Sequence, residues 1–187
     1  MSIAGYILST ARLGLRRFVA ADVNALATMN RDEAVMKYFP ALLTEAQTIA
    51  MMQRIDEHFE KNGFGLFAVE NIATKEFIGL TGFAIPAFES FFTPCVEIGW
   101  RYKKEVWGSG FATEAAAACL HYGFTVLHFN KVLSFTAAIN LNSEKVMQRI
   151  GMRKIGFFDH PSIEKGNALC KHVVYAIDNK KENTGTP

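Results

Sequence analysis

The most regular alternation of apolar and polar residues in the chain runs from residue 96 to residue 103. The even positions are apolar and comprise Val96, Ile98, Trp100 and Tyr102. The odd positions carry Glu97, Gly99, Arg101 and Lys103. A period of two predicts a strand with its apolar side chains on one face. The alanine-rich run after Ala112 predicts a helix, and a glycine turn over 107–112 separates this helix from the strand.

The other periodicities predict six further strands and three further helices. The strands are expected at residues 13–15, 64–70, 77–85, 132–138, 153–158 and 170–178. The helices are expected over 22–29, 44–62 and 143–150. Thr44 begins a capping-box pattern, Asp22 is the expected N-cap of the first helix, and Asn142 or Ser143 that of the third. The first strand, 13–15, alternates like an edge strand.

This order of elements predicts an α/β (α+β) fold. Helices are expected to flank a mixed, mostly antiparallel central sheet. The strands at 96–102 and 132–138 are expected to be parallel, because a helix crosses over between them. We expect a single domain over residues 1–178 and a flexible polar tail over 179–187.

Composition and charge narrow the class of protein. Half of the 187 residues are hydrophobic, a fifth are charged and the formal net charge is +2, which is ordinary for a globular enzyme and gives no indication of a nucleic-acid partner. No signal peptide or membrane span is predicted, and a cytoplasmic location is expected. The isolated Cys95, Cys119 and Cys170 are expected to be reduced thiols. Neither the cysteines nor the histidines show the spacing of a metal site.

The strand, glycine turn and helix together predict a binding site for a phosphate or pyrophosphate. The first turn of a helix carries free N–H groups and a partial positive charge, and the glycines Gly108 and Gly110 let a ligand approach the backbone. A turn that merely packs the helix closely on the strand is the alternative. No P-loop motif occurs in the chain. A dinucleotide fold is not favoured, because Thr113 replaces the third small residue of its fingerprint.

The same residues resemble a known family. The segment Trp107-x-x-Gly110-x-Ala112 resembles the pyrophosphate loop of the GNAT acetyltransferases, Gln/Arg-x-x-Gly-x-Gly/Ala, although Trp107 departs from its first position. The longer run Trp-Gly-x-Gly-Phe-Ala-Thr-Glu-Ala is similar to the RimJ/RimL branch of ribosomal-protein N-terminal acetyltransferases. Further similar motifs begin at Arg12, Phe77, Glu97 and Asn140, in the order of the family.

The resemblance implies that acetyl-CoA lies between the two central parallel strands, which splay apart. The pantetheine arm is then expected to pair with the backbone of Trp100, Arg101 and Tyr102. The family's Asn-x-x-Ser matches Asn140 and Ser143, which are expected to bond the arm and its sulfur end, unless they are a plain helix cap. The pyrophosphate is expected on the turn that consists of Trp107, Gly108, Ser109, Gly110, Phe111 and Ala112, with Thr113 nearby.

Two residues are candidates for catalysis. Glu97 is the candidate base for the acceptor amine, and its alternatives are an exposed strand carboxylate or an ion pair with Arg101. An α-amine with a pKa near 8 is easier to deprotonate than a lysine with a pKa near 10.4. Ser143 is the candidate donor to the leaving thiolate, and an N–H near Trp100 or Arg101 is the candidate oxyanion donor. His160 and His172 are expected to be structural or to lie beside the acceptor groove.

The leading function is therefore an acetyl-CoA-dependent N-acetyltransferase that acts on a protein N-terminus, such as that of a ribosomal protein. A small amine acceptor (polyamine, amino acid or antibiotic) and a non-catalytic acyl-CoA sensor are the alternatives. A monomer and a homodimer both fit the sequence. Two apolar loops have open roles: residues 38–43 form a plug under the helices or a wall of the acceptor pocket, and residues 86–94, with Phe88, Phe91 and Phe92, form a lid on the core or a substrate contact.

Overall fold

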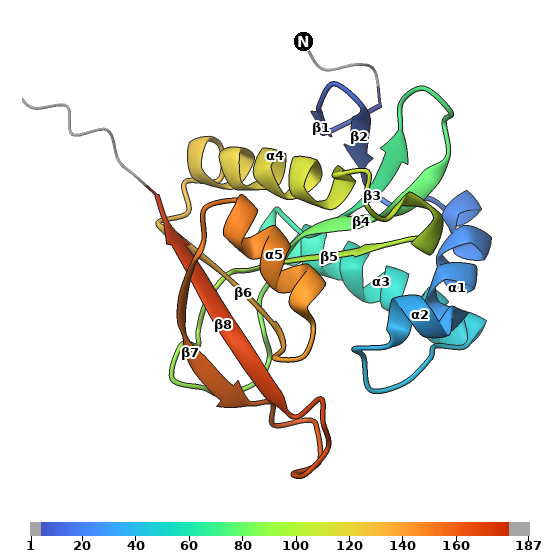
Figure 1. Ribbon diagram of the computed structural model, residues 1–187. Helices are drawn as coiled ribbons and strands as arrows, with labels where there is room; N and C mark the ends of the chain where they lie inside the picture. The colour runs from blue at the N-terminus through green and yellow to red at the C-terminus, as the bar shows by residue number, and fades with distance from the viewer. Residues whose placement is uncertain (1–4, 180–187) are drawn as a thin grey trace, which may run out of the picture.

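The computed structural model describes residues 5–179, which form one eight-stranded sheet in the order β1-β2-β3-β4-β5-β6-β8-β7 (Figure 1). The strands are β1 (Leu8–Ser9), β2 (Leu13–Arg16), β3 (Leu66–Asn71), β4 (Phe77–Ala84), β5 (Glu97–Tyr102), β6 (Lys131–Ala137), β7 (Arg153–Asp159) and β8 (Lys171–Asp178). The helices are α1 (Val23–Arg31), α2 (Glu33–Met36), α3 (Glu45–Asn62), α4 (Phe111–Thr125) and α5 (Leu141–Arg149), with short 3-10 turns at Ala20–Asp22 and Lys104–Val106.

The pairing of β5 with β6 is parallel and every other strand pair is antiparallel, which confirms the predicted mixed fold. Within residues 5–179, β5 and β6 share a single register pair, Glu97 with Leu133. The strands therefore separate beyond Glu97, and the edge of β5 that faces β6 keeps backbone groups without a strand partner. This separation positions the candidate site.

Helices cover the central strands on both faces. Alternate residues of β5 and its neighbour β4 point to opposite sides. Ile98 and Phe83 join Ala115 and Cys119 of α4 in one core cluster. Leu80 of β4 lies in a second cluster, which includes Leu26 and Met29 of α1. The two clusters define an α4 face and an α1 face of the sheet at β5.

The local signals at the helix ends were partly correct. Thr44 and Gln47 form the predicted capping box at the start of α3, and Gly63 ends this helix with a φ of +76°. Asp22 is not a side-chain cap for α1, because its carboxylate binds Arg16 instead. The cap of α5 is Asn140 rather than Asn142 or Ser143, and the helix begins two residues earlier than predicted.

Two elements were missed, and one of them changes the position of β2. The two-residue strand β1 pairs with β2, so β2 lies inside the sheet and the edge assignment was wrong. The four-residue helix α2 is too short to show a helical period, and Asp32 caps it through the N–H groups of Ala34 and Val35.

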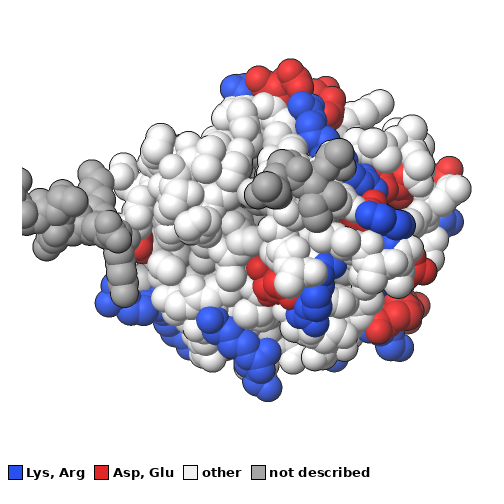
Figure 2. Space-filling model, turned by 90° about the horizontal axis from the view of Figure 1, so that it is seen from above, with Lys and Arg blue, Asp and Glu red and all other residues white. Residues whose placement is uncertain are grey.

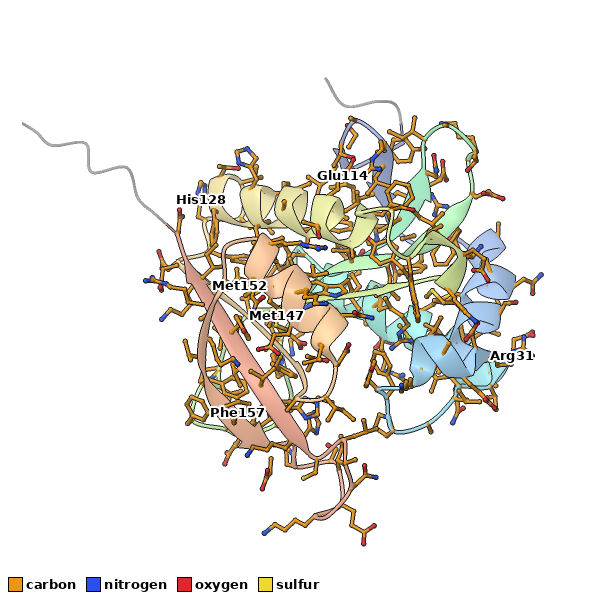
Figure 3. The ribbon with its side chains drawn as sticks, viewed as in Figure 1. Arg31, Glu114, His128, Met147, Met152 and Phe157 are labelled. Atoms are coloured by element: carbon orange, nitrogen blue, oxygen red, sulfur yellow. The ribbon has the colours of Figure 1, made fainter. Side chains whose placement is uncertain are left out.

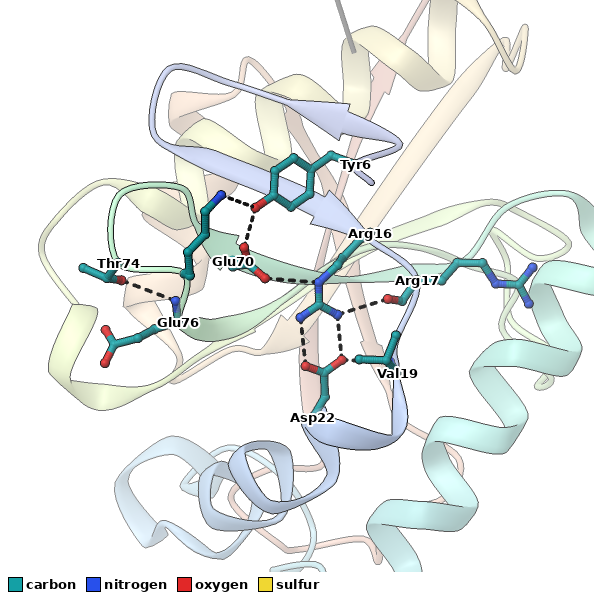
Figure 4. Close-up of polar contacts among 9 residues, drawn as sticks. Tyr6, Arg16, Arg17, Val19, Asp22, Glu70, Thr74 and Glu76 are labelled. Atoms are coloured by element: carbon teal, nitrogen blue, oxygen red, sulfur yellow. Dashed lines mark hydrogen bonds and ion pairs between the residues drawn. The ribbon is translucent and has the colours of Figure 1, made fainter. Parts of the chain in front are cut away.

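A buried ion network joins these N-terminal elements to the sheet (Figure 4). Arg16 on β2 lies between Asp22, at 2.7 Å, and Glu70 on β3, at 3.2 Å. The hydroxyl of Tyr6 donates to Glu70 from the other side. Arg16 therefore has a carboxylate on each side, as a largely buried cation requires.

Charged side chains are distributed without a single dominant patch on the face that carries α4 and β1. Figure 2 shows Lys and Arg beside Asp and Glu at the rim and near the middle of this face, with a large uncharged area next to them. None of the helices within residues 5–179 combines the length and apolar composition that a membrane span requires. Cys95, Cys119 and Cys170 are free thiols. Asn179, the predicted first residue of the tail, donates to the carbonyls of Phe124 and Phe129, and the rest of that segment lies outside the described residues.

Candidate active site between β5 and β6

A cavity of about 670 Å³ opens where β5 and β6 separate. Its lining comes from β5, the turn before α4, the end of β6 with α5, and the loop after α2. This volume is in the range of small-molecule sites. Figure 3 shows the side chains of this region, with Met147 of α5 at the cavity and Glu114 at the N-terminal end of α4.

The glycine turn presents a row of free backbone donors. Gly108 and Gly110 both have a φ of +80°, a left-handed conformation that favours glycine, and Gly110 is the N-cap of α4. The N–H groups of Trp107 and Ser109 donate to the carbonyls of Lys104 and Val106 in the preceding 3-10 turn. Of the N–H groups from Trp107 to Thr113, those of Gly108, Gly110, Phe111, Ala112 and Thr113 have no acceptor among the described residues. Such a row at a helix N-terminus is suited to a phosphate group.

Arg12 holds this turn in place, a role that the sequence did not indicate. Its guanidinium donates to the carbonyl of Ser109 at 3.0 Å and pairs with Glu114 of α4 at 2.5 Å. Burial raises the pKa of Glu114, but hydrogen bonds from Thr10 and Arg12 outweigh this effect and leave the pKa below its ordinary value. The turn is thus tied to the start of β2. Ser109 is the one predicted loop residue that does not line the cavity among the residues described.

Trp107, the residue that departs from the family pattern, links the turn to the strand. Its indole N–H donates to the carbonyl of Tyr102 at 3.0 Å. The hydroxyl of Tyr102 lies 2.7 Å from that of Thr81 inside the core. Trp100, Tyr102 and Trp107 all line the cavity.

Glu97 lines the cavity at the point where β5 and β6 part. In the part of the chain that the structure describes, its carboxylate has no hydrogen bond and no ion pair. Burial raises the pKa of Glu97 to about 8. It is therefore not an ordinary exposed strand carboxylate. No ion pair joins it to Arg101 in the described chain, and the Arg101 guanidinium donates to Asn30 at 2.5 Å. A carboxylate with this pKa is suited to accept a proton near neutral pH.

Asn140 and Ser143 lie on the opposite wall, and Asn140 also caps α5. The side-chain oxygen of Asn140 accepts from the backbone N–H of Ser143 at 3.3 Å. Its side-chain amide nitrogen donates to the hydroxyls of Thr136 at 2.9 Å and Ser143 at 3.1 Å. Both residues line the cavity. Because the Ser143 oxygen accepts from Asn140, its own hydrogen is free to be donated to a ligand.

The loop after α2 forms a wall of the cavity rather than a plug beneath the helices. Tyr38, Phe39 and Pro40 line it on the α1 side. His160 and His172 line it on the far side with ring centroids 4.9 Å apart, and burial lowers the pKa of both.

The aromatic loop 86–94 does not line the cavity among the residues described. Phe88 lies 4.9 Å from the ring of His160, and Phe88 and Phe92 both contact Phe135 and Phe158. Phe91 is 65% exposed. The loop therefore packs behind His160, outside the cavity. This arrangement agrees better with a lid on the core than with a substrate contact.

Comparisons with known proteins place this arrangement in a family. The family model described as acetyltransferase (GNAT) domain matches residues 12–153. The uncharacterized N-acetyltransferase YnaD of Bacillus subtilis is 33% identical, over 91% of this chain and 95% of that protein. A GNAT-family acetyltransferase from Bacillus anthracis has a TM-score of 0.76 at 29% identity, over 93% of this chain and 99% of that one. A spermidine N-acetyltransferase from Vibrio cholerae, solved with CoA and spermine, has a TM-score of 0.73 at 22% identity, over 92% and 98% of the two chains.

The residues present fit acetyl-CoA as the cosubstrate. The turn before α4 offers five N–H groups without a protein acceptor in the described chain, which suit a pyrophosphate. The separated strands leave a cavity of about 670 Å³, and beyond Glu97 the edge of β5 that faces β6 has no strand partner among the described residues. Together with the match over residues 12–153, these features show that the chain belongs to the GNAT acetyltransferases and is an acetyl-CoA-dependent N-acetyltransferase.

Proposed function

We propose that the protein transfers the acetyl group of acetyl-CoA directly to the α-amine of a peptide or protein N-terminus, in the manner of the RimJ/RimL branch. The observation that carries this proposal is the unpaired Glu97 carboxylate, in the cavity at the parting of β5 and β6. The pyrophosphate lies on the turn over 107–113, and the pantetheine arm runs along the backbone of Trp100, Arg101 and Tyr102. Asn140 and Ser143 bond the arm near its sulfur.

Glu97 removes one proton from the ammonium form of the acceptor, directly or through a water. The free amine then attacks the thioester carbonyl, so that a C–N bond forms and the C–S bond breaks. Ser143 donates a hydrogen bond to the departing thiolate. The thiolate takes the second proton of the amine and leaves as the thiol. A strand N–H near Trp100 or Arg101 holds the oxyanion.

The pKa of Glu97 supports an α-amine over a lysine side chain. A base with a pKa of about 8 is matched to an α-amine of similar pKa, so the proton transfer is nearly balanced. For a lysine, the mismatch of about 2.4 pKa units adds about 3 kcal/mol. The charged residues that line the cavity are Glu97, Arg101, Lys145 and Arg149, a set that also disfavours a polycation such as spermidine.

The acceptor class is tested with two versions of one lysine-containing peptide, the first with a free N-terminus and the second with a blocked N-terminus. We expect acetylation of the free α-amine and a kcat/KM at least about tenfold lower for the blocked peptide, as the pKa argument requires. Mass spectrometry locates the acetyl group, and spermidine is assayed in parallel. A higher kcat/KM for the blocked peptide or for spermidine would overturn the choice of acceptor but not the family.

A further inference from the structure

Arg101 occupies the cavity on the α1 face of β5 and is held there rigidly. One of its terminal nitrogens donates to the side-chain oxygen of Asn30 at 2.5 Å. Its guanidinium lies 4.0 Å from the ring centroid of Phe39. Asn30 is itself fully buried and donates to Thr48 at 3.1 Å. The position of the guanidinium is therefore fixed by the fold before any ligand binds.

This guanidinium lacks an anionic partner. Within residues 5–179 it makes one hydrogen bond, although an arginine has five N–H donors, and its Nε is buried without an acceptor. No carboxylate of the described chain lies within ion-pair distance of it. Arg16, by contrast, lies between two carboxylates, and Arg12 and Arg17 also pair with acidic residues.

A buried cation without a counter-charge is unfavourable for folding, because the lost hydration is not replaced. Burial lowers the pKa of Arg101 to about 10, so the side chain still carries its charge near neutral pH. The unfavourable energy is offset when an anion enters the cavity. A carboxylate fits best, since its two oxygens match the planar fork of a guanidinium.

The phosphates of acetyl-CoA do not supply this anion in the arrangement above. The pyrophosphate is placed at the N-terminus of α4, and α4 packs on the other face of the sheet. Arg101 is opposite Leu80 in the register of β4 and β5, and Leu80 belongs to the cluster on the α1 face. Asn30 and Phe39, the contacts of Arg101, come from α1 and from the loop after α2. The anion therefore comes from the acceptor.

We infer that Arg101 binds a carboxylate of the acceptor, so that the substrate carries both an amine and a carboxylate. This inference rests on the proposed function, which places the amine at Glu97. Four residues along a strand separate Glu97 from Arg101, which is about 13 Å between their Cα atoms. The amine and carboxylate of one α-amino acid are only about 3 Å apart. A peptide of two to four residues spans the interval better, with its amine at Glu97 and its carboxylate at Arg101.

The test uses a ladder of alanine peptides from one to four residues, each as the free acid and as the C-terminal amide. In the tri- and tetrapeptides the terminal carboxylate is too far from the amine to change its pKa strongly, so these pairs isolate recognition of the carboxylate. For the native protein we expect kcat/KM to be about tenfold or more higher for the acid than for the amide, mainly through KM.

Arg101→Gln removes the charge and keeps a side-chain amide that can still donate to Asn30. We expect this variant to lose the preference for the acid, so that its kcat/KM values for the acid and the amide of one peptide agree within about twofold. Arg31→Gln is the matched control, because Arg31 follows Asn30 in the chain, is 54% exposed, points outward in Figure 3 and does not line the cavity. This control is expected to keep the preference.

Equal use of acid and amide by the native protein, or an acid preference that survives in Arg101→Gln, would overturn the inference. Acetylated amides would at the same time leave the proposed function standing, whereas no acetylation of any peptide would count against the proposed function. A second readout needs no turnover: in the presence of CoA, the tripeptide acid is expected to raise the unfolding temperature of the native protein more than its amide does. Arg101→Gln is expected to abolish that difference, and its persistence would contradict the role of Arg101.

Discussion

Replacement of Glu97 by Gln is expected to lower kcat/KM for the amine acceptor by about 100-fold to 1,000-fold, within the usual contribution of a general base. The amide has nearly the shape of the carboxylate but cannot accept a proton. Acetyl-CoA affinity is expected to stay within about twofold, because no charged group of the cofactor is placed at this residue. Steady-state rates with a peptide acceptor, together with a titration of acetyl-CoA, measure both quantities.

The activity of the native protein and that of Glu97→Gln are also expected to depend differently on pH. Burial raises the pKa of Glu97 to about 8, so its carboxylate form is populated as the pH rises through 8. The activity of the native protein is therefore expected to rise with pH up to about that value, and the residual activity of Glu97→Gln is expected to lack the contribution of this group. Glu89→Gln, in the loop 86–94, removes an exposed carboxylate and serves as the control. A profile of the same shape in both variants would remove Glu97 from the role of base.

The same group links stability to pH. The folded-state pKa of Glu97 lies above its ordinary value of 4.5, so its contribution is present at low pH and is lost as the pH rises towards 8. The native protein loses this contribution as the pH rises, whereas Glu97→Gln has no carboxylate to titrate at this position. The unfolding temperature of Glu97→Gln minus that of the native protein is therefore expected to be larger at pH 9 than at pH 5. An equal difference at both values would show that the carboxylate is not buried as described.

Replacement of Thr113 by Glu is expected to weaken acetyl-CoA binding on the order of 100-fold. Thr113 lines the cavity in the first turn of α4, where its N–H is one of the free donors. A carboxylate about 6 Å from a phosphate charge costs about 2–3 kcal/mol at an effective dielectric constant of about 20. The same carboxylate interacts favourably with the helix N-terminus and is expected to stabilise the fold by about 0.3–1 kcal/mol.

This combination of a more stable fold with weaker binding separates a ligand effect from misfolding. Ala117→Glu places the same charge on the exposed side of α4, away from the cavity lining, and is expected to leave the affinity within about threefold, the limit for a screened surface charge. Calorimetric titration and thermal unfolding report the two effects separately. If Thr113→Glu bound acetyl-CoA as tightly as the native protein, the pyrophosphate could not lie on this turn.

The parts of the site that are local in sequence were predictable. The alternation over 96–102 and the two glycines of the turn identified β5 and the start of α4. These features depend on side-chain periodicity and on the conformational freedom of glycine. Both can be recognised from a few consecutive residues.

The parts that depend on distant partners were not predictable. Asp22 resembles an N-cap, but Arg16 and the Val19 N–H bind its carboxylate instead. The hydrogen bond from Arg12 to the carbonyl of Ser109 in the glycine turn joins residues about a hundred positions apart. The lack of a carboxylate partner for Arg101 in the described chain and the raised pKa of Glu97 depend on residues that are near them only in the folded protein. Local sequence patterns do not contain this information.

The most direct test of acetyl transfer at this cavity is the release of CoA thiol from acetyl-CoA, measured with and without a peptide amine. We expect release that depends on the amine, with one thiol formed for each acetylated amine, and a loss of that release in Glu97→Gln. Thiol release at the same rate without the amine, or tight binding of acetyl-CoA with no release in the presence of the amine, would contradict transfer of the acetyl group at Glu97.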